Sequence, residues 1–259
     1  MKKKPHILVS NDDGIDAPGL LTLVRALKRF AKVSVVAPSI QQSAIGHAIT
    51  MRTPLRAHEF YRDGTMFGYA VDGTPADCVK LAIKSLVKQK PDLIISGIND
   101  GLNTAVNVIY SGTVSAATEG TILGIPAIAV SLEYTLKPNF DTSARVAVRF
   151  ARFVYEKGLP KDTILNINVP AIPVKRIKGI RFTRQGRSRW DDEFFQRKDP
   201  KNRDYFWLAG KMHVFDRDDR ADQVALKAGY ISVTPIHFDL THHEYLKELQ
   251  EKWEGKIKI

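Results

Sequence analysis

Short apolar runs alternate with segments of helical periodicity along much of the chain. Runs of four to six apolar residues are typical of buried parallel strands, and the segments between them carry apolar residues three and four positions apart. This alternation predicts βαβ units and an α/β fold with a parallel sheet. The expected strands are residues 7–10, 33–37, 93–96, 127–131 and 164–169, and the expected helices are 19–30, 74–87, 114–123 and a long one from Asp141 to Gly158.

The pattern changes in two places. Residues 50–71 contain β-prone pieces around a turn at 62–65, which predicts a hairpin between the second strand and the helix after Thr74. Residues 181–220 are rich in charged and aromatic side chains without a clean period, which indicates an arm or an insertion. Beyond them we expect a strand at 230–234 and a terminal helix at 243–253.

Composition limits the class of protein. A chain of 259 residues that is 44% hydrophobic can bury a core of ordinary size. The apolar stretch behind the basic start 1–4 is too short for a signal-peptide core or a membrane span, so we expect no membrane partner. The single cysteine, Cys78, favours a reducing compartment, so we expect a cytoplasmic protein.

The net charge of +11 favours anionic ligands, but the basic residues are spread along the sequence instead of forming one tract. A basic soluble surface accounts for most of them. Charge alone therefore does not identify a partner.

Two adjacent carboxylates, Asp12 and Asp13, follow the first apolar run. At the carboxyl end of a parallel strand they lie where open α/β sheets bind ligands. Their mutual repulsion is relieved by a divalent cation, which prefers carboxylate oxygens. The same Asn-Asp-Asp-Gly sequence is also good turn chemistry, and an Asp can cap the helix that follows. On this segment alone, a metal site and a turn are equally well supported.

Three further loops place ligand-like groups at the same edge of the sheet. The loop after the second strand, 39–47, carries hydroxyls and His47, which could reach a metal or a substrate. The turn at 96–103 combines glycines with Asn side chains, whose oxygens suit a hard cation. Residues 110–114 place hydroxyls and a glycine before a helix, an arrangement that attracts phosphate. Taken alone, the first of these loops is better explained as a polar surface loop, the second is equally an ordinary turn, and the third is also explained by a helix cap. Because all four loops fall on one edge of the sheet, together they predict a site for metal-assisted attack on a phosphate ester.

The chain resembles the SurE survival-protein nucleotidases, which are metal-dependent phosphatases that act on nucleoside monophosphates. The resemblance covers nearly the whole chain, and the order and combination of its motifs are highly specific. The matching segments are Asn-Asp-Asp-Gly at 11–14, Ala-Pro at 37–38 with Gln-Ser at 42–43, Asp-Gly-Thr-Pro-Ala-Asp-Cys-Val at 72–79, Ser-Gly-Ile-Asn at 96–99 with Asn103, Tyr-Ser-Gly-Thr-Val at 110–114 leading to Glu-Gly at 119–120, and Gly-Tyr-Ile-Ser-Val-Thr-Pro at 229–235.

The resemblance implies the components of the site. One divalent ion per subunit, Mg, Mn or similar, is expected to be held by the oxygen ligands Asp12, Asp13, Ser43 and Asn99. Contacts to the substrate phosphate are expected from Asn103, Ser111, Gly112 and Thr113. The substrate is expected to be a nucleoside 5′- or 3′-monophosphate, with short polyphosphate as a further candidate, and no stable nucleic-acid partner is expected.

The resemblance also implies a Rossmann-like three-layer core with a mostly parallel sheet. On this basis residues 1–170 form the catalytic core, and 171–259 form a C-terminal arm and oligomerisation segment, of which 230–235 return to the core. The extended arm swaps between subunits in this family, so a homodimer or homotetramer is expected. Two departures from the family pattern concern loop geometry: Ala105 stands where the family usually has glycine, and Ser115 where a smaller residue is common.

The expected reaction is attack of water on phosphorus, helped by the metal, with the nucleoside leaving as its alcohol. Asp12 and Asp13 are the catalytic candidates, and either could accept the proton of the water.

Three alternatives to this reaction are less well supported by the sequence. A phosphoryl-aspartate mechanism needs two aspartates separated by one residue, and a phosphoacceptor signalling domain needs a further Asp and a Lys that the later strands lack. A nucleic-acid-binding module would use the charge and the aromatic residues at 181–205.

Overall fold

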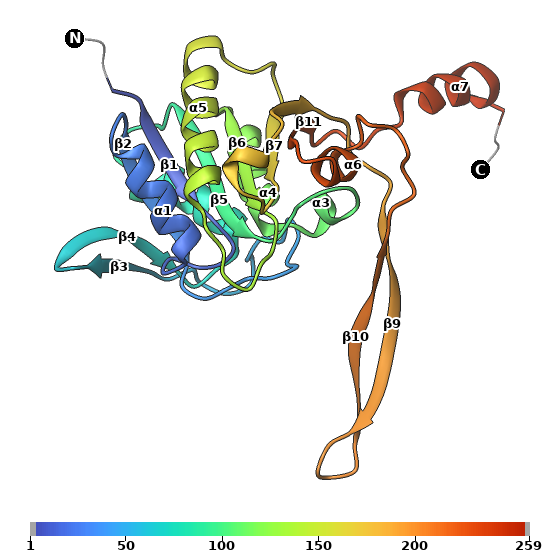
Figure 1. Cartoon of the computed structure of the whole chain (residues 1–259), viewed down its shortest axis with the longest axis horizontal. Coiled ribbons are helices and arrows are strands. Elements are labelled where there is room, and N and C mark those ends of the chain that lie inside the picture. Colours follow the sequence, from blue (N-terminus) through green and yellow to red (C-terminus); the bar gives the residue numbers. More distant parts are fainter. Residues whose placement is uncertain (1–3, 257–259) are drawn as a thin grey trace.

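In a computed structural model, which describes residues 4–256, the chain folds into a large sheet covered by helices on both faces, with a long hairpin projecting from it (Figure 1). Residues 1–3, with most of the basic start, and 257–259 lie outside the described residues. The strands are β1 (His6–Ser10), β2 (Lys32–Pro38), β3 (Ala57–Arg62), β4 (Thr65–Val71), β5 (Leu93–Asp100), β6 (Ala127–Leu132), β7 (Thr163–Val169), β8 (Ile180–Phe182), β9 (Arg189–Lys198), β10 (Asp204–His213) and β11 (Ile231–His237).

The helices lie between these strands. They are α1 (Pro18–Leu27), α2 (Pro75–Leu81), α3 (Asn107–Tyr110), α4 (Gly112–Ile122), α5 (Asp141–Lys157), α6 (Asp222–Lys227) and α7 (His243–Trp253), with a π-helical turn η1 (Ala82–Leu86) that continues α2 and a 3₁₀ turn η2 (Val174–Arg176). No helix among residues 4–256 is long and apolar enough to cross a bilayer.

Nine strands form one mixed sheet in the order β3-β4-β2-β1-β5-β6-β7-β11-β8. The central pairs β4-β2, β2-β1, β1-β5, β5-β6 and β6-β7 are parallel, as is β11-β8, whereas β3-β4 and β7-β11 are antiparallel. The prediction of an α/β fold with a mostly parallel sheet is confirmed. The predicted hairpin at 50–71 is confirmed as β3 and β4, and β4 joins the main sheet by pairing with β2.

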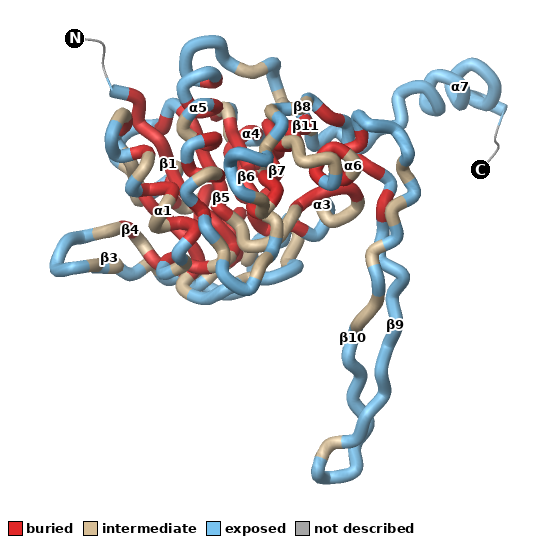
Figure 2. Tube along the Cα trace, in the orientation of Figure 1, coloured by how far each residue is buried: buried red, intermediate tan, exposed pale blue. Residues whose placement is uncertain are grey.

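Two apolar layers hold the helices to the sheet. On one face Leu20 and Leu23 of α1 and Ala147 of α5 pack with the strands, and on the other face Val79 of α2 and Ala117 of α4 do so. Figure 2 shows this buried centre, with the exposed hairpin outside it. The result is the three-layer arrangement expected from the resemblance.

Local sequence explains where the helices begin and end. Thr74 accepts a hydrogen bond from the Asp77 backbone and the Asp77 carboxylate accepts one from Thr74, so α2 begins with a capping box ahead of Pro75. Gly158 stops α5 with a φ of 72°. The expectation that the first helix extends to residue 30 is wrong, because α1 ends at Leu27.

The C-terminal part has three features. The strands β9 and β10 pair only with each other in a long antiparallel hairpin that leaves the body of the molecule (Figure 1). The strand β11 lies inside the main sheet beside β7. The helix α7, which was predicted at residues 243–253, is exposed on every face.

Candidate active site

A cavity of about 1050 Å³ opens at the carboxyl edge of the central strands. The loops after β1 and β2, the end of β5 and the start of α4 all contribute to its wall. Six of the eight predicted site residues line it: Asp12, Asp13, Ser43, Asn99, Asn103 and Ser111. The two others, Gly112 and Thr113, lie directly behind Asp12.

Asp12 is buried against the start of α4. The Thr113 hydroxyl donates to its carboxylate, and the Cα of Gly112 lies so close that a side chain there would meet Asp12. Burial raises the pKa of Asp12, while the hydrogen bonds from Thr113 and from the Gly112 backbone oppose that rise. In this structure the donors at the start of α4 therefore serve the carboxylate of Asp12 instead of pointing into the cavity.

Asp13 is less buried and faces the end of β5. Burial is the main cause that raises its pKa to about 6, and the charge of Asp12 adds to the rise. The backbone N–H of Asp100 donates to its carboxylate at 3.2 Å. Within residues 4–256 no cationic side chain forms an ion pair with Asp12 or Asp13, so two crowded carboxylates lack a positive partner.

Neutral oxygen donors lie beside the two carboxylates. The Asn99 side-chain N–H donates to the carbonyl of Gly101 at 2.8 Å, which leaves its amide oxygen available to a ligand. The backbone N–H of Gln42 donates to the carbonyl of Asp12 at 2.7 Å and holds the loop with Ser43 beside Asp12. The strand β5 includes residues 96–100, so the prediction of a turn beginning at Ser96 is wrong and Asn99 lies on a strand end.

The described residues contain no group of three or more His, Cys, Asp or Glu side chains that could hold a metal. The donor set at the cavity is instead two carboxylates, one hydroxyl and one amide oxygen. This is the all-oxygen chemistry that Mg²⁺ and similar hard cations accept, and not a set that favours zinc. The residues present therefore fit the hard divalent ion expected from the sequence.

Asn103 is held rigidly at the cavity wall. Its backbone N–H donates to Asn168 at 2.8 Å, and its carbonyl accepts hydrogen bonds from Asn166 and Asn168 of β7. Its side-chain N–H donates to Ser131 at 2.9 Å, which leaves its second N–H available. Because β6 and β7 both fix Asn103, its side chain has a defined direction beside the cavity.

Ser111 caps α4, and its hydroxyl accepts from the backbone N–H of Val114 at 3.0 Å. The sequence suggested that Gly112 and Thr113 precede the helix. This is wrong, because α4 begins at Gly112 and both residues belong to its first turn. Ser115, one of the two departures from the family pattern, is buried and donates to the carbonyl of Ser111 at 2.6 Å. It therefore fits this helix start without displacing a site residue.

His47 does not reach the cavity. Its ring nitrogen pairs with the buried carboxylate of Glu119 on α4 at 3.0 Å, and Lys80 contacts the same carboxylate at 3.0 Å. The suggestion that His47 could bind the metal is therefore not supported by its position. Its contact anchors the loop after β2 to α4.

The sequence did not identify the part of the cavity beyond the carboxylates. The β9-β10 hairpin adds Trp190 near its base and Leu208, which pairs with Phe194 midway along the strands, and α3 adds Asn107 and Tyr110. The indole N–H of Trp190 donates to the Asn107 side chain at 3.2 Å, which fixes the ring at the cavity edge. For Trp190 the sequence offers only an excess of aromatic residues after 181, because its contact with Asn107 joins segments more than 80 residues apart.

The fold and the site define a class: α/β proteins with a paired-aspartate oxygen site at the carboxyl edge of a mostly parallel sheet. The family model of Survival protein SurE matches residues 7–192. The chain belongs to this family, as the sequence predicted.

The similarity to known proteins covers almost the full chain. The 5′-nucleotidase SurE of Chlorobaculum tepidum is 47% identical over 97% of this chain and 95% of its own, and that of Syntrophobacter fumaroxidans is 47% identical over 96% and 99%. The crystal structure of the Aquifex aeolicus SurE protein superposes with a TM-score of 0.82 at 40% identity, covering 95% of this chain and 99% of that one.

Proposed function

We propose that this protein is a metal-dependent phosphomonoesterase that hydrolyses nucleoside 5′-monophosphates, and also 3′-monophosphates, to nucleoside and phosphate. The observation that carries the proposal is the pair Asp12 and Asp13, crowded at the cavity without a cationic partner among the described residues. The names of the 43–47% identical relatives, 5′-nucleotidase SurE, support the same reaction class.

The site residues have different proposed roles. Asp12, Asp13, Ser43 and Asn99 would hold one divalent ion, Mg²⁺ or Mn²⁺, which supplies a positive charge for a phosphate oxygen and lowers the pKa of water. Asn103 and Ser111 donate to the phosphate from the cavity wall. The donors of Gly112 and Thr113 hold the carboxylate of Asp12, and their predicted contact with phosphate requires that they turn from it.

Hydrolysis then follows from this arrangement. Water attacks phosphorus opposite the nucleoside oxygen, and one of the two aspartates accepts a proton from the water. As the bond from phosphorus to the nucleoside oxygen breaks, that proton passes to the departing oxygen, so the nucleoside leaves as its alcohol.

The outer half of the cavity supports a nucleoside as the leaving group. Tyr110, Trp190 and Leu208 give it flat and apolar walls close to the proposed phosphate site. Aromatic side chains stack on all nucleobases with about 1–3 kcal/mol per base. A small phosphate ester would gain nothing from these walls.

The assembly is also a proposal. The hairpin is exposed along most of its length (Figure 2). Its aromatic side chains Phe194, Phe206 and Trp207 are among the exposed large hydrophobic groups. Isolated two-stranded hairpins are marginally stable in water, so a second copy of the chain that covers this one would stabilise it. We therefore propose a homodimer or homotetramer built by exchange of the C-terminal arm. Light scattering of the purified chain measures the number of subunits directly.

The reaction is tested with purified protein on a panel of nucleoside 5′- and 3′-monophosphates and short polyphosphate, with Mg²⁺, Mn²⁺ or a chelator. Phosphate release is expected only with metal, and Asp12→Asn is expected to abolish it. Full activity in chelator would contradict the proposal. Salt-sensitive binding to oligonucleotides without any hydrolysis of mononucleotides would favour the nucleic-acid-binding alternative. A cytoplasmic location, supported by the single buried thiol of Cys78, is part of the same proposal.

A further inference from the structure

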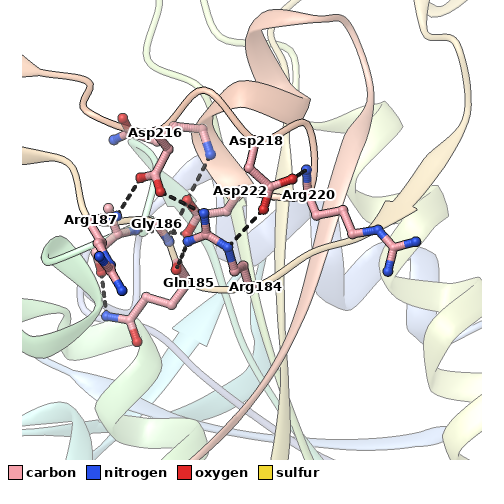
Figure 3. A network of polar contacts seen from close by, with 10 residues as sticks. Arg184, Gln185, Gly186, Arg187, Asp216, Asp218, Arg220 and Asp222 are labelled. Carbon is pink, nitrogen blue, oxygen red and sulfur yellow. Dashed lines mark hydrogen bonds and ion pairs between the residues drawn. The ribbon is translucent and has the colours of Figure 1, made fainter.

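A buried carboxylate outside the cavity joins the loop of Asn103 to the root of the hairpin. Asp222, the first residue of α6, is fully buried and accepts hydrogen bonds from the backbone N–H groups of Ala105 at 2.8 Å, Gly186 at 3.1 Å and Gln223 at 2.7 Å. Figure 3 shows Asp222 beside Gly186 and Arg184. Burying a carboxylate is costly unless hydrogen bonds compensate, and the three donors together offset that cost.

Ala105 is the residue that this carboxylate holds. Its φ is +51°, in the left-handed region that strains a residue other than glycine. Asp222 fixes the N–H of Ala105, and the Gln185 side chain donates to its carbonyl at 2.8 Å. The N–H and the carbonyl of Ala105 are thus both held by residues that lie 80 or more positions later in the chain.

The held residue lies two positions after Asn103. Gln223 adds a hydrogen bond from its side chain to Thr104 at 3.2 Å, so three consecutive residues of this loop are fixed. Asn166 and Asn168 hold the carbonyl of Asn103 from the opposite side. The direction in which Asn103 faces the cavity therefore depends on two sets of contacts, one from β7 and one from the segment around Asp222.

A second layer ties the same network to the hairpin. Arg184 pairs with Asp216 at 2.8 Å and with Asp218 at 3.0 Å, and the backbone N–H of Arg187 donates to Asp216 at 2.6 Å (Figure 3). These contacts cross between the segment that enters β9 and the segment that leaves β10. The root of the hairpin and the loop 103–106 consequently form one rigid unit, with Gly186 and Asp222 at their junction.

We propose that Asp222 is a positioning residue, which aims Asn103 at the substrate phosphate by holding Ala105 in its left-handed conformation against the hairpin root. The proposal rests on the phosphatase function proposed above. The Asp222 side chain contacts neither the proposed metal ligands nor the proposed phosphate site. Loss of its carboxylate therefore weakens stabilisation of the transition state and leaves the binding of metal unchanged.

The first test compares Asp222→Asn with Asp219→Asn in the intact chain. Asn keeps the shape of Asp222 but accepts fewer hydrogen bonds, and we expect kcat on a nucleoside monophosphate to fall about tenfold or more with Mn²⁺ affinity unchanged. Asp219 is an exposed neighbour that pairs with Arg181 at 3.3 Å and takes no part in the contacts that hold Ala105, so Asp219→Asn is expected to keep the wild-type kcat. Unchanged kcat and KM in Asp222→Asn, with only a lower Tm, would overturn the proposal.

Two further variants approach the same contact from its other sides. A Cβ on Gly186 would lie 2.7 Å from the Asp222 carboxylate, so Gly186→Ala displaces that group without removing its charge. We expect it to lower kcat as Asp222→Asn does, and it decides the question if Asp222→Asn fails to fold. Wild-type kcat in a folded Gly186→Ala would count against the proposal.

Glycine adopts the conformation of Ala105 without strain, so Ala105→Gly needs less support from Asp222. We expect the double variant Ala105→Gly with Asp222→Asn to recover part of the lost kcat, and no recovery would contradict the positioning role. Failure of the unaltered protein to release phosphate from any nucleotide is a separate outcome. It would refute the proposed function, whereas normal activity in the Asp222 variants would refute only this inference.

Discussion

The most informative single substitution is Gly112→Ala at the start of α4. A Cβ there would lie 2.7 Å from the Cβ of Asp12, 3.0 Å from its carboxylate and 3.1 Å from the ring of Pro75. Carbon atoms pack at about 3.5–4.0 Å, so Asp12 would have to move by roughly 1 Å. Its Cβ is bound to the backbone and cannot rotate away. The position of the carboxylate, and not only the stability of the helix, is therefore at risk.

The magnitude follows from two effects. Overpacking of this kind costs about 1–3 kcal/mol of stability, and a 1 Å misplacement at a reacting centre costs about 100-fold in rate. We expect Gly112→Ala to lose at least that factor in kcat/KM for a nucleoside monophosphate. We also expect it to bind Mn²⁺ more weakly in calorimetric titration.

A matched control lies eight residues further along the same helix. A Cβ on Gly120 would meet the side-chain tip of Ile94 at 2.3 Å, far from the cavity. Gly120→Ala is expected to lower Tm but to keep metal affinity and kcat/KM within about threefold. If Gly112→Ala folds and keeps wild-type activity and metal affinity, the placement of Asp12 in the site is wrong.

Three further predictions follow from the same residues. Because burial raises the pKa of Asp13 to about 6, a proton competes with the cation below that pH, so Mn²⁺ should raise Tm more at about pH 7.5 than at about pH 5; an equal rise at both would contradict this. Thr113→Val removes a hydrogen bond that lowers the pKa of Asp12, so the acid limb of the pH–rate profile should move to higher pH, and an unmoved limb would exclude this role. Trp190→Ala should raise KM for nucleoside monophosphates about tenfold but leave KM for ribose 5-phosphate, which has no aromatic ring, unchanged; equal losses on both substrates would exclude base stacking.

The central sheet could be predicted because each of its strands is an almost continuous apolar run between helices of clear period. The strands 7–10 and 127–131 lie within one residue of β1 and β6. Short elements gave no such signal. The strand β8 and the helices α3 and α6 are held by tertiary contacts of a few residues and carry too few turns or alternations to show a period.

The candidate site divides in the same way. The paired aspartates and the strand-end Asn and Ser residues could be found because parallel strands bring their carboxyl ends to one edge. Trp190 and Asp222 could not, because each acts through contacts with residues more than 80 positions away. Ala105 shows the limit most clearly: its departure from glycine is visible in the sequence, but the hydrogen bonds that hold it at φ +51° depend on the folded chain.

The central claim is that one divalent ion lies between Asp12 and Asp13. Anomalous diffraction from crystals soaked in Mn²⁺ measures its position directly. We expect one peak per chain beside both carboxylates and within reach of Ser43 and Asn99. The absence of a peak there, or a peak elsewhere in the molecule, would contradict the account.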